Sequence, residues 1–384
     1  MTASVRNFFN SLTQQYQSIY IVGLGTTAFQ LGILNSIGGL AGAAIASAAG
    51  WLADRQGMKA VMLLGMPFMV LGALIFVLAS DWAIAIPALI LATVALRIEM
   101  TACPMVCGTY LKSEERAMGM QFCDTLSAVP RLFSPIIGAV IVTSFGGINV
   151  DGIRPLYYVQ AAGFILVLLI IWKMFTVPKR GPAPSNRSFA GGMREVLQQG
   201  PTIRRWIAYI CLATIPMFVG PTYIPLYGAE VKMADQFVLG GMATASMIVP
   251  LVLSIPVGHW ADTVGRKKVI YVATSLHCLS LALLIYAPDS TLLLASAVLQ
   301  GFLTLGMVTQ GAMSAELVPI SLLGRWYGLL GFFRGLVSVA APAVGGMVWS
   351  SIGPVYVFIL LIATELLKLL ILVGVPETLK ARGV

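Results

Sequence analysis

The chain has 384 residues, of which 58% are hydrophobic and only 10% are charged. A soluble domain carries roughly 25% charged residues, so this composition excludes an ordinary soluble protein and indicates a chain surrounded by lipid. The formal net charge of +9 raises the question of nucleic acid, but the basic residues are divided among separate loops, which excludes that partner. The five cysteines lie in apolar stretches and are interpreted as buried small residues, so neither a metal site nor a cofactor is predicted.

Twelve stretches along the chain each suit a helix of about 20 residues that crosses a membrane. Lipid-exposed strands in series would leave backbone groups unpaired, so the predicted fold class is an all-α membrane protein. No cleavable signal peptide is predicted, because residues 1–20 lack an apolar core. The predicted spans are 4–22, 31–52, 60–79, 83–109, 118–144, 155–175, 205–227, 237–259, 269–287, 291–315, 326–350 and 355–375.

The first span is unusually polar for a membrane helix. Asn10, Gln14 and Gln17 belong to one polar stripe at helical spacing, which predicts a helix that lines a cavity. A surface amphipathic helix followed by eleven spans is the alternative interpretation. The span begins almost at Met1, which suggests that a turn or more of it is missing from this chain.

The distribution of positive charge predicts the orientation. If residues 53–59 are cytoplasmic, alternation places 17 of the 24 Lys and Arg in cytoplasmic loops, and only Arg154 and Lys232 in outer loops. This asymmetry follows the positive-inside rule and places both termini in the cytoplasm. We therefore expect a multi-pass protein of the plasma (cell inner) membrane, working in the lipid bilayer as a monomer.

The longest polar break, at residues 176–204, is rich in Pro, Gly and Arg and is typical of a cytoplasmic linker. It separates two predicted bundles of six helices, at residues 1–175 and 205–384. The second bundle repeats the first, because a shift of 208 positions superposes identical residues: Gly50, Ala53, Asp54, Gly57 and Lys59 fall on Gly258, Ala261, Asp262, Gly265 and Lys267. Such repeats are typical of secondary transporters, whose solute site lies between the halves.

The two repeated loops read Gly50-Trp-Leu-Ala-Asp54-Arg55-Gln-Gly57-Met58-Lys59 and Gly258-His-Trp-Ala-Asp262-Thr-Val-Gly265-Arg266-Lys267. Both resemble the signature loop of the major facilitator superfamily, and the span count and linker extend the resemblance over the whole chain. Met58 and Thr263 depart from the pattern. The resemblance implies two bundles related by a pseudo-two-fold axis along the membrane normal, with these loops acting in conformational gating.

Several charged residues lie at membrane depth, where each needs an ion-pair partner or has a functional role. Arg97 and Arg131 each lie 15 residues from a basic residue at the predicted cytoplasmic edge, about 22 Å along a helix. Together they either bind an anionic solute or form structural pairs. Glu99 and Asp124 are the predicted proton carriers, because burial favours a protonated carboxyl group. Arg334 and Glu365 are predicted to form a structural ion pair.

By the same resemblance, the first, fourth, seventh and tenth helices line the solute cavity. The residues expected to line it are Asn10, Gln14, Gln17, Thr93, Arg97, Thr101, Arg131, Tyr223, Tyr227, Gln300 and Thr304. The predicted function is proton-coupled secondary transport of a small organic solute by alternating access. An uncoupled facilitator and a non-transporting sensor or scaffold are the alternatives. An enzyme is not expected, because the chain has no P-loop sequence and only two histidines without a catalytic motif.

Overall fold

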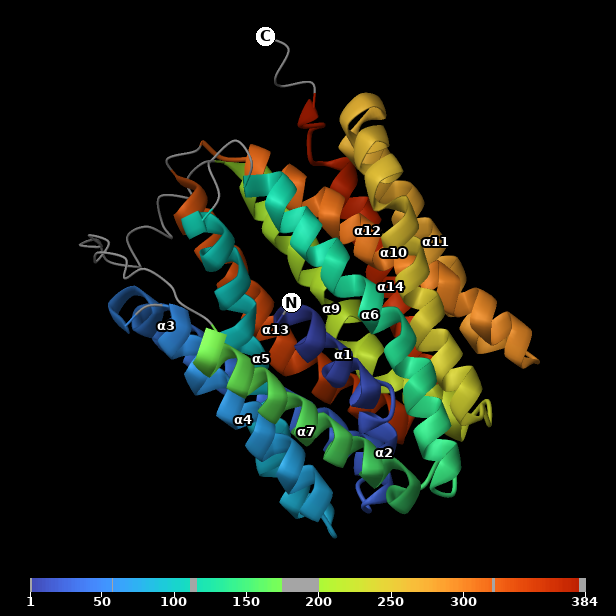
Figure 1. The fold of residues 1–384 in the computed structure, drawn as a ribbon. Helices are drawn as coiled ribbons and strands as arrows, with labels where there is room; N and C mark the ends of the chain where they lie inside the picture. Colours follow the sequence, from blue (N-terminus) through green and yellow to red (C-terminus); the bar gives the residue numbers. More distant parts are fainter. Residues whose placement is uncertain (1, 57, 111–115, 175–199, 320–321, 380–384) are drawn as a thin grey trace. The chain divides into compact units, whose positions relative to one another are not determined.

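The structure is a computed structural model that describes residues 2–56, 58–110, 116–174, 200–319 and 322–379. Some side chains within these helices, including those of residues 46–58 and 99–126, lie outside the description. The described residues form thirteen α-helices and no β-strand (Figure 1). The predicted all-α fold class is therefore confirmed.

The chain forms two compact units. Unit 1 comprises residues 1–184, 222–240 and 342–347, and unit 2 comprises residues 185–221, 241–341 and 348–384. Seven helices lie in unit 1 only: α1 (Thr2–Gln14), α2 (Gln17–Gly23), α3 (Ala28–Gln56), α4 (Met58–Leu78), α5 (Trp82–Tyr110), α6 (Arg116–Ser144) and α7 (Val150–Met174).

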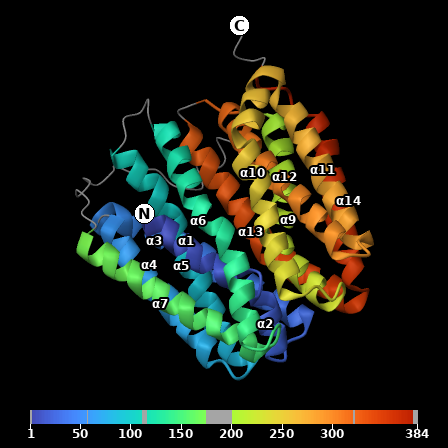
Figure 2. The same ribbon diagram turned by 45° about the vertical axis from the view of Figure 1, so that its right-hand side comes forward.

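The second part of the chain supplies six helices: α9 (Pro201–Glu230), α10 (Gln236–Val264), α11 (Arg266–Tyr286), α12 (Ser290–Glu316), α13 (Leu323–Ser351) and α14 (Pro354–Val373). Parts of α9, α10 and α13 belong to unit 1. Figure 2 shows α4, α5 and α7 packed together in unit 1, and α11, α12 and α14 packed together in unit 2.

Each predicted span coincides with a helix or, for the first span, with two. Residues 4–22 form α1 and α2, which are separated by a turn at Gln15 and Tyr16. The other helices generally extend a few residues beyond the predicted limits, because a helix continues past the apolar core into the polar ends of the membrane. The break in the first span is a feature that the polarity pattern does not predict.

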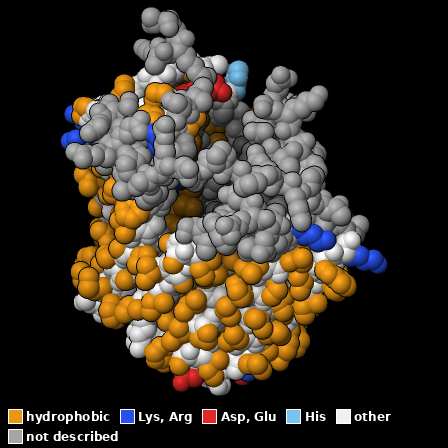
Figure 3. Space-filling model, turned by 90° about the vertical axis from the view of Figure 1, so that its left-hand side faces the viewer, with side chains coloured by type: hydrophobic (Ala, Val, Ile, Leu, Met, Phe, Trp, Pro, Cys, Tyr) orange, Lys and Arg blue, Asp and Glu red, His pale blue; other side chains and the backbone are white. Residues whose placement is uncertain are grey.

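Within the described residues, nine helices are long and apolar enough to cross a membrane, and two shorter apolar stretches occupy residues 62–78 and 82–96. Large apolar side chains point outward from these helices: Ile255 is 85% exposed and Leu370 is 69% exposed. Figure 3 shows hydrophobic side chains over much of one face of the molecule, with charged side chains mainly at its margins. Such a surface is suited to lipid.

Polar residues fix the starts of several helices. Asn149 Oδ1 accepts a hydrogen bond from the Gly152 amide (2.7 Å) at the start of α7. Asp235 Oδ1 and Asp289 Oδ1 likewise accept hydrogen bonds from backbone amides at the starts of α10 (2.8 Å) and α12 (2.9 Å). These side chains satisfy backbone N–H groups that have no partner within the helix, so the short loops end in defined helix starts.

Helix α1 is held against α6 by direct contacts. Ser134 Oγ donates to Phe8 O (2.5 Å), and Gln15 Nε2 donates to Pro135 O (3.2 Å). A Cβ atom at Gly138 would lie 2.9 Å from Leu12 O, so glycine permits the close approach of the two backbones. Leu12 is completely buried. The alternative of a surface amphipathic helix is therefore wrong.

Candidate functional site

Unit 1 contains a cavity with a volume of about 140 Å³. Its walls come from α1, α2, α4, α5 and α7, which pack around it. The polar lining consists of Asn10, Thr13, Gln14, Gln17, Thr93, Tyr157 and Gln160, and the apolar lining of Met69, Ala73, Phe76, Ala92, Leu96 and Phe164. A polar cavity of this volume has room for several water-sized groups.

Four of the predicted cavity residues meet in this pocket. Asn10 and Gln14 come from α1, Gln17 from α2, and Thr93 from α5. The polar stripe of the first span therefore faces a cavity. Gln160 was missed by the sequence analysis; its Nε2 donates to Thr13 Oγ1 (2.9 Å) and links α7 to the same stripe.

Tyr157 gives the pocket an unsatisfied polar group. Its side chain is 1% exposed, and its hydroxyl has no hydrogen-bond partner among the described residues. The ring stacks on Phe76 with centroids 4.8 Å apart, which fixes its orientation. A buried hydroxyl without a partner is energetically costly, and a bound solute could supply the partner.

Tyr223 and Tyr227 were predicted to line the cavity, but in this conformation both are buried in helix packing. The Tyr223 hydroxyl lies 2.8 Å from Pro342 O and 3.3 Å from Ala28 O. Lys232 Nζ lies 5.7 Å from the centroid of the Tyr227 ring. The aromatic stripe of this span is therefore a packing surface here, which sequence periodicity does not distinguish from a recognition surface.

The tenth predicted span is α12, in which Gln300 and Thr304 were expected to line the solute cavity. Gln300 Nε2 donates to Ser296 Oγ within the same helix (3.4 Å), and Thr304 is exposed. Neither lines either of the two cavities described for unit 1 and unit 2. Met307 and Gln310 line a cavity in unit 2 instead.

Arg131 is the one predicted anion-binding residue whose side chain is described. It is half-buried on α6, and its Nε has no hydrogen-bond partner within the described part of the chain. It does not line the unit 1 cavity. The side chains of Arg97, Glu99, Thr101 and Asp124 lie outside the described residues, so their roles stay predictions.

The second signature loop forms an ionic cluster in unit 2. Gly258 and Asp262 end α10, and Arg266 begins α11. Arg266 Nη2 lies 3.3 Å from Asp262 Oδ1 and 2.9 Å from Glu316 Oε1. Glu316 closes α12, so one guanidinium joins three helices through two carboxylates.

Glu377 completes this cluster from beyond α14. Its carboxylate accepts hydrogen bonds from the backbone amides of Arg266 (3.2 Å) and Lys267 (3.0 Å), where a helix N-terminus favours negative charge. Gly265 has φ +121°, and a Cβ atom there would lie 3.0 Å from Glu377 Oε2. Lys267 Nζ donates to Val375 O (2.7 Å). The loop thus holds the chain that follows α14.

The first signature loop is mostly outside the description, including the side chains of Gly50, Asp54, Arg55 and Gly57. Lys59 is described, and its Nζ donates to Trp172 O (3.0 Å) on α7. Whether the first loop forms a cluster like that around Arg266 stays a prediction.

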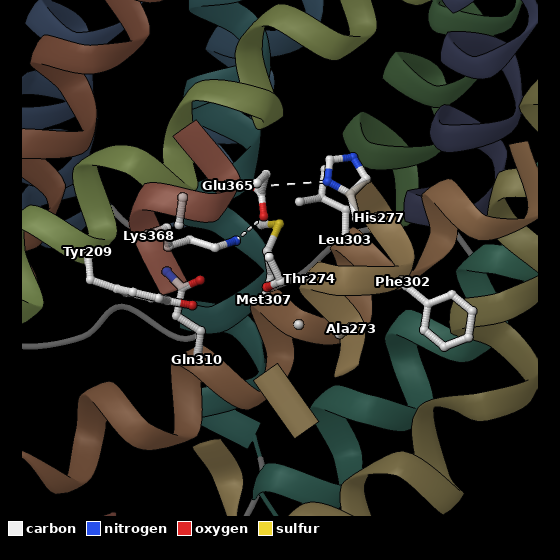
Figure 4. A pocket seen from close by; sticks show the side chains of 12 residues that line it. Tyr209, Ala273, Thr274, His277, Phe302, Leu303, Met307, Gln310, Glu365 and Lys368 are labelled. Carbon is white, nitrogen blue, oxygen red and sulfur yellow. Dashed lines mark hydrogen bonds and ion pairs between the residues drawn. The ribbon is translucent and has the colours of Figure 1, made fainter. Parts of the chain in front are cut away.

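The predicted ion pair of Arg334 with Glu365 is wrong for this structure. Glu365 Oε2 accepts a hydrogen bond from Lys368 Nζ (2.5 Å), and Glu365 Oε1 lies 3.9 Å from His277 Nδ1 (Figure 4). Lys368 lies three residues along the same helix, close to one turn, so it is the nearer cation. Arg334 is half-buried on α13, and the described salt bridges do not include it.

Comparison with known proteins assigns this helical architecture to a family. The model of the Major Facilitator Superfamily matches residues 4–242 and 232–383. An uncharacterized MFS-type transporter, YdgK of Bacillus subtilis (strain 168), is 26% identical over 193 residues. That match spans 47% of this chain and 47% of the relative, so the alignment covers about half the length of each.

Solved structures share the fold. The nucleoside transporter NupG superposes with a TM-score of 0.76 at 12% identity, covering 96% of both chains. A POT family transporter in complex with a thioalcohol-conjugated peptide superposes with a TM-score of 0.76 at 13% sequence identity, covering 97% of this chain and 94% of its own. The human organic anion transporter MFSD10 superposes with a TM-score of 0.68 at 13% sequence identity, covering 97% of both chains.

The family match covers nearly the whole chain, and the helices and signature loop agree with it. The chain therefore belongs to the Major Facilitator Superfamily and is a membrane transporter of that family.

Proposed function

We propose that this transporter is a secondary carrier that binds a small, uncharged polar solute in the unit 1 cavity and moves it by alternating access. The observation that carries the proposal is the polar lining of this cavity, with the buried Tyr157 hydroxyl that lacks a partner among the described residues. Carriers of this type place the solute at mid-membrane depth among helix faces that can open to either side.

The lining argues for the class of solute. Among the described residues, it contains six carboxamide or hydroxyl side chains on Asn10, Thr13, Gln14, Gln17, Thr93 and Gln160, three aromatic rings, and no Asp, Glu, Lys, Arg or His. Carboxamides and hydroxyls both donate and accept hydrogen bonds, and rings pack on planar or apolar faces. An uncharged solute with several hydroxyl or amide groups matches these walls better than an ion, which would need a compensating charge.

An anionic solute is the second candidate. Arg131 favours it, because a half-buried guanidinium whose Nε has no partner among the described residues is able to receive a carboxylate or phosphate. Arg97 is its proposed partner. This candidate requires that both side chains reach the solute in another conformation, since Arg131 does not line the cavity in this one.

The signature loop supplies the proposed gate. The Arg266 cluster joins α10, α11 and α12 through Asp262 and Glu316, so helices that move relative to one another must exchange or break these contacts. We propose protons as the coupling ion, with Glu99 and Asp124 as candidate carriers. An uncoupled facilitator and a sensor that binds without flux are the competing proposals. The proposed setting is the inner cell membrane, with cytoplasmic termini and a monomeric carrier.

A flux assay on purified protein in vesicles tests the proposal. The panel contains nucleosides, a dipeptide, neutral sugars and organic anions, each measured with and without an imposed pH gradient. We expect flux of an uncharged member, dependent on the gradient. The Tyr157→Phe variant removes only the unsatisfied hydroxyl, and we expect it to lower kcat/KM about tenfold, as loss of a hydrogen bond worth about 1.4 kcal/mol would.

Tyr286→Phe is the matched control, because Tyr286 is 81% exposed at the end of α11. It should transport like the unmodified protein. Flux confined to organic anions, with loss in Arg131→Gln and none in Tyr157→Phe, would select the second candidate. Saturable binding of a panel member without any flux would select the sensor.

A further inference from the structure

Three ionisable side chains that do not line the cavity proposed for the solute lie together inside unit 2. His277 comes from α11, and Glu365 and Lys368 come from α14. They are 2%, 1% and 4% exposed, within helices apolar enough to cross a membrane. Charged groups at such depth are costly and mark functional sites more often than packing does.

The contacts within the cluster are incomplete. Lys368 Nζ is bonded to Glu365 Oε2 (2.5 Å), but Glu365 Oε1 and His277 Nδ1 have no hydrogen-bond partner in the described structure. Those two atoms face each other at 3.9 Å (Figure 4). A hydrogen bond between them needs a proton on one of the two atoms and an approach of about 1 Å.

A small cavity adjoins the cluster. It has a volume of about 10 Å³, room for about one water molecule, and is lined by all three ionisable side chains, with Thr274, Tyr209 and Gln310 as polar neighbours. Lys368 Nζ lies 5.8 Å from the centroid of the Tyr209 ring. The Lys368 side chain therefore borders free space and a ring face that attracts cations.

We propose that His277, Glu365 and Lys368 form a proton-binding site inside unit 2, which takes up one proton between His277 Nδ1 and Glu365 Oε1. Without that proton the charges of Glu365 and Lys368 cancel. When the proton is bound, His277 and Glu365 form a hydrogen bond that connects α11 with α14. Lys368 then loses part of the negative charge that balances its own, and its side chain turns toward the cavity and Tyr209. The other titratable groups around the site, among the described residues, are Tyr209 on α9 and Tyr271 and Cys278 on α11. The described α12 side chains that line the cavity are uncharged.

The site is positioned to affect the gate. Helix α11 begins at the signature loop, where Glu377, beyond α14, accepts from the amides of Arg266 and Lys267. His277 lies eleven residues further along α11, about 16 Å at the helical rise. The same two helices are thus joined at the loop and at the cluster. A role of this proton as the coupling ion would rest on the proposed function. Binding of a proton by His277 and Glu365 does not rest on it.

Histidine NMR tests the site without a transported solute, because the chain has only two histidines. The full-length protein carrying His259→Asn reports on His277 alone, in nanodiscs titrated between about pH 5 and about pH 8. We expect the His277 ring signals to change with pH, with uptake of about one proton per molecule. In Glu365→Gln the same signals should no longer change, because the shared acceptor is gone.

Glu230→Gln is the control, since Glu230 is an exposed carboxylate at the end of α9 and should leave the titration unchanged. If Glu365→Gln does not fold, His277→Gln replaces it, and proton uptake over the range should fall by about one relative to the unmodified protein. A His277 signal that stays constant, or one that titrates equally in Glu365→Gln, would overturn the assignment. Failure of the solute panel would leave these spectra unaffected, so the two proposals fail separately.

Discussion

At the scale of single residues, the ion pairs of Arg266 connect neighbouring helices. Arg266 is buried, and its guanidinium bridges the ends of α10 and α12 through Asp262 and Glu316. Glu377 lies against the first turn of α11. The contacts of Glu316 and Glu377 do not follow from the Gly-x-x-x-Asp pattern itself, because these residues are 50 or more positions from Arg266 in the sequence.

Removing the Glu377 carboxylate should loosen the start of α11. In Glu377→Ala the amides of Arg266 and Lys267 lose their acceptor, and loss of such a cap costs about 1 kcal/mol. We expect a lower unfolding midpoint in a thermal melt of the purified protein in detergent. Glu230→Ala, at an exposed carboxylate, should melt like the unmodified chain; equal melting of both variants would contradict the capping role.

At the scale of helices, the first span shows what a polarity pattern can predict. Its polar stripe indicated a cavity wall, and Asn10, Gln14 and Gln17 line the pocket of unit 1. The break at Gln15 and Tyr16 was not predicted, because the residues there are compatible with a helix and the contacts that hold them are distant. Gln15 binds Pro135 O on α6, and the Tyr16 hydroxyl donates to Gln236 O (3.0 Å).

Helix packing around Gly138 yields a stability prediction. In Gly138→Val the added side chain would meet the backbone carbonyl of Leu12, which cannot move without displacing α1. We expect a loss of about 1–3 kcal/mol, as overpacking usually costs, measured by unfolding in a mild denaturing detergent. Gly331→Val on α13 is the control, because a Cβ atom there meets no atom within 4 Å. A larger loss at Gly331 than at Gly138 would refute the packing argument.

Residues of the site that sequence analysis missed share one property. Gln160, Glu316 and Lys368 lie on helices whose partners are fixed only by the three-dimensional packing of each unit. Hydropathy fixes where a span lies and an internal repeat identifies its loops, but neither gives the rotation of a helix about its axis. That rotation put Met307 and Gln310 on the cavity face of α12 in place of Thr304.

At the scale of the whole molecule, the spans and the family could be predicted from composition, repeat and signature loops, and the family match confirms them. The division into two six-helix bundles at residues 176–204 stays a prediction, because most of that segment is outside the described residues. The orientation in the membrane also stays a prediction, since it rests on the distribution of Lys and Arg.

Cysteine labelling in intact cells measures that orientation. On a background without the five native cysteines, Met233→Cys and Thr263→Cys place a thiol at exposed positions before α10 and at its C-terminal end. We expect a membrane-impermeant maleimide to label position 233 from outside and position 263 only after the cells are opened. Labelling in the reverse order would invert the topology and place the signature loops outside.

The interruption between α1 and α2 has a mechanical consequence for the solute. Gln14 ends one segment and Gln17 begins the next, and both side chains face the same pocket. A solute that hydrogen-bonds to both side-chain amides would connect α1 and α2 across the break between them. Binding of the solute would fix the angle between α1 and α2. The backbone conformation of the first span would therefore depend on whether the pocket is occupied.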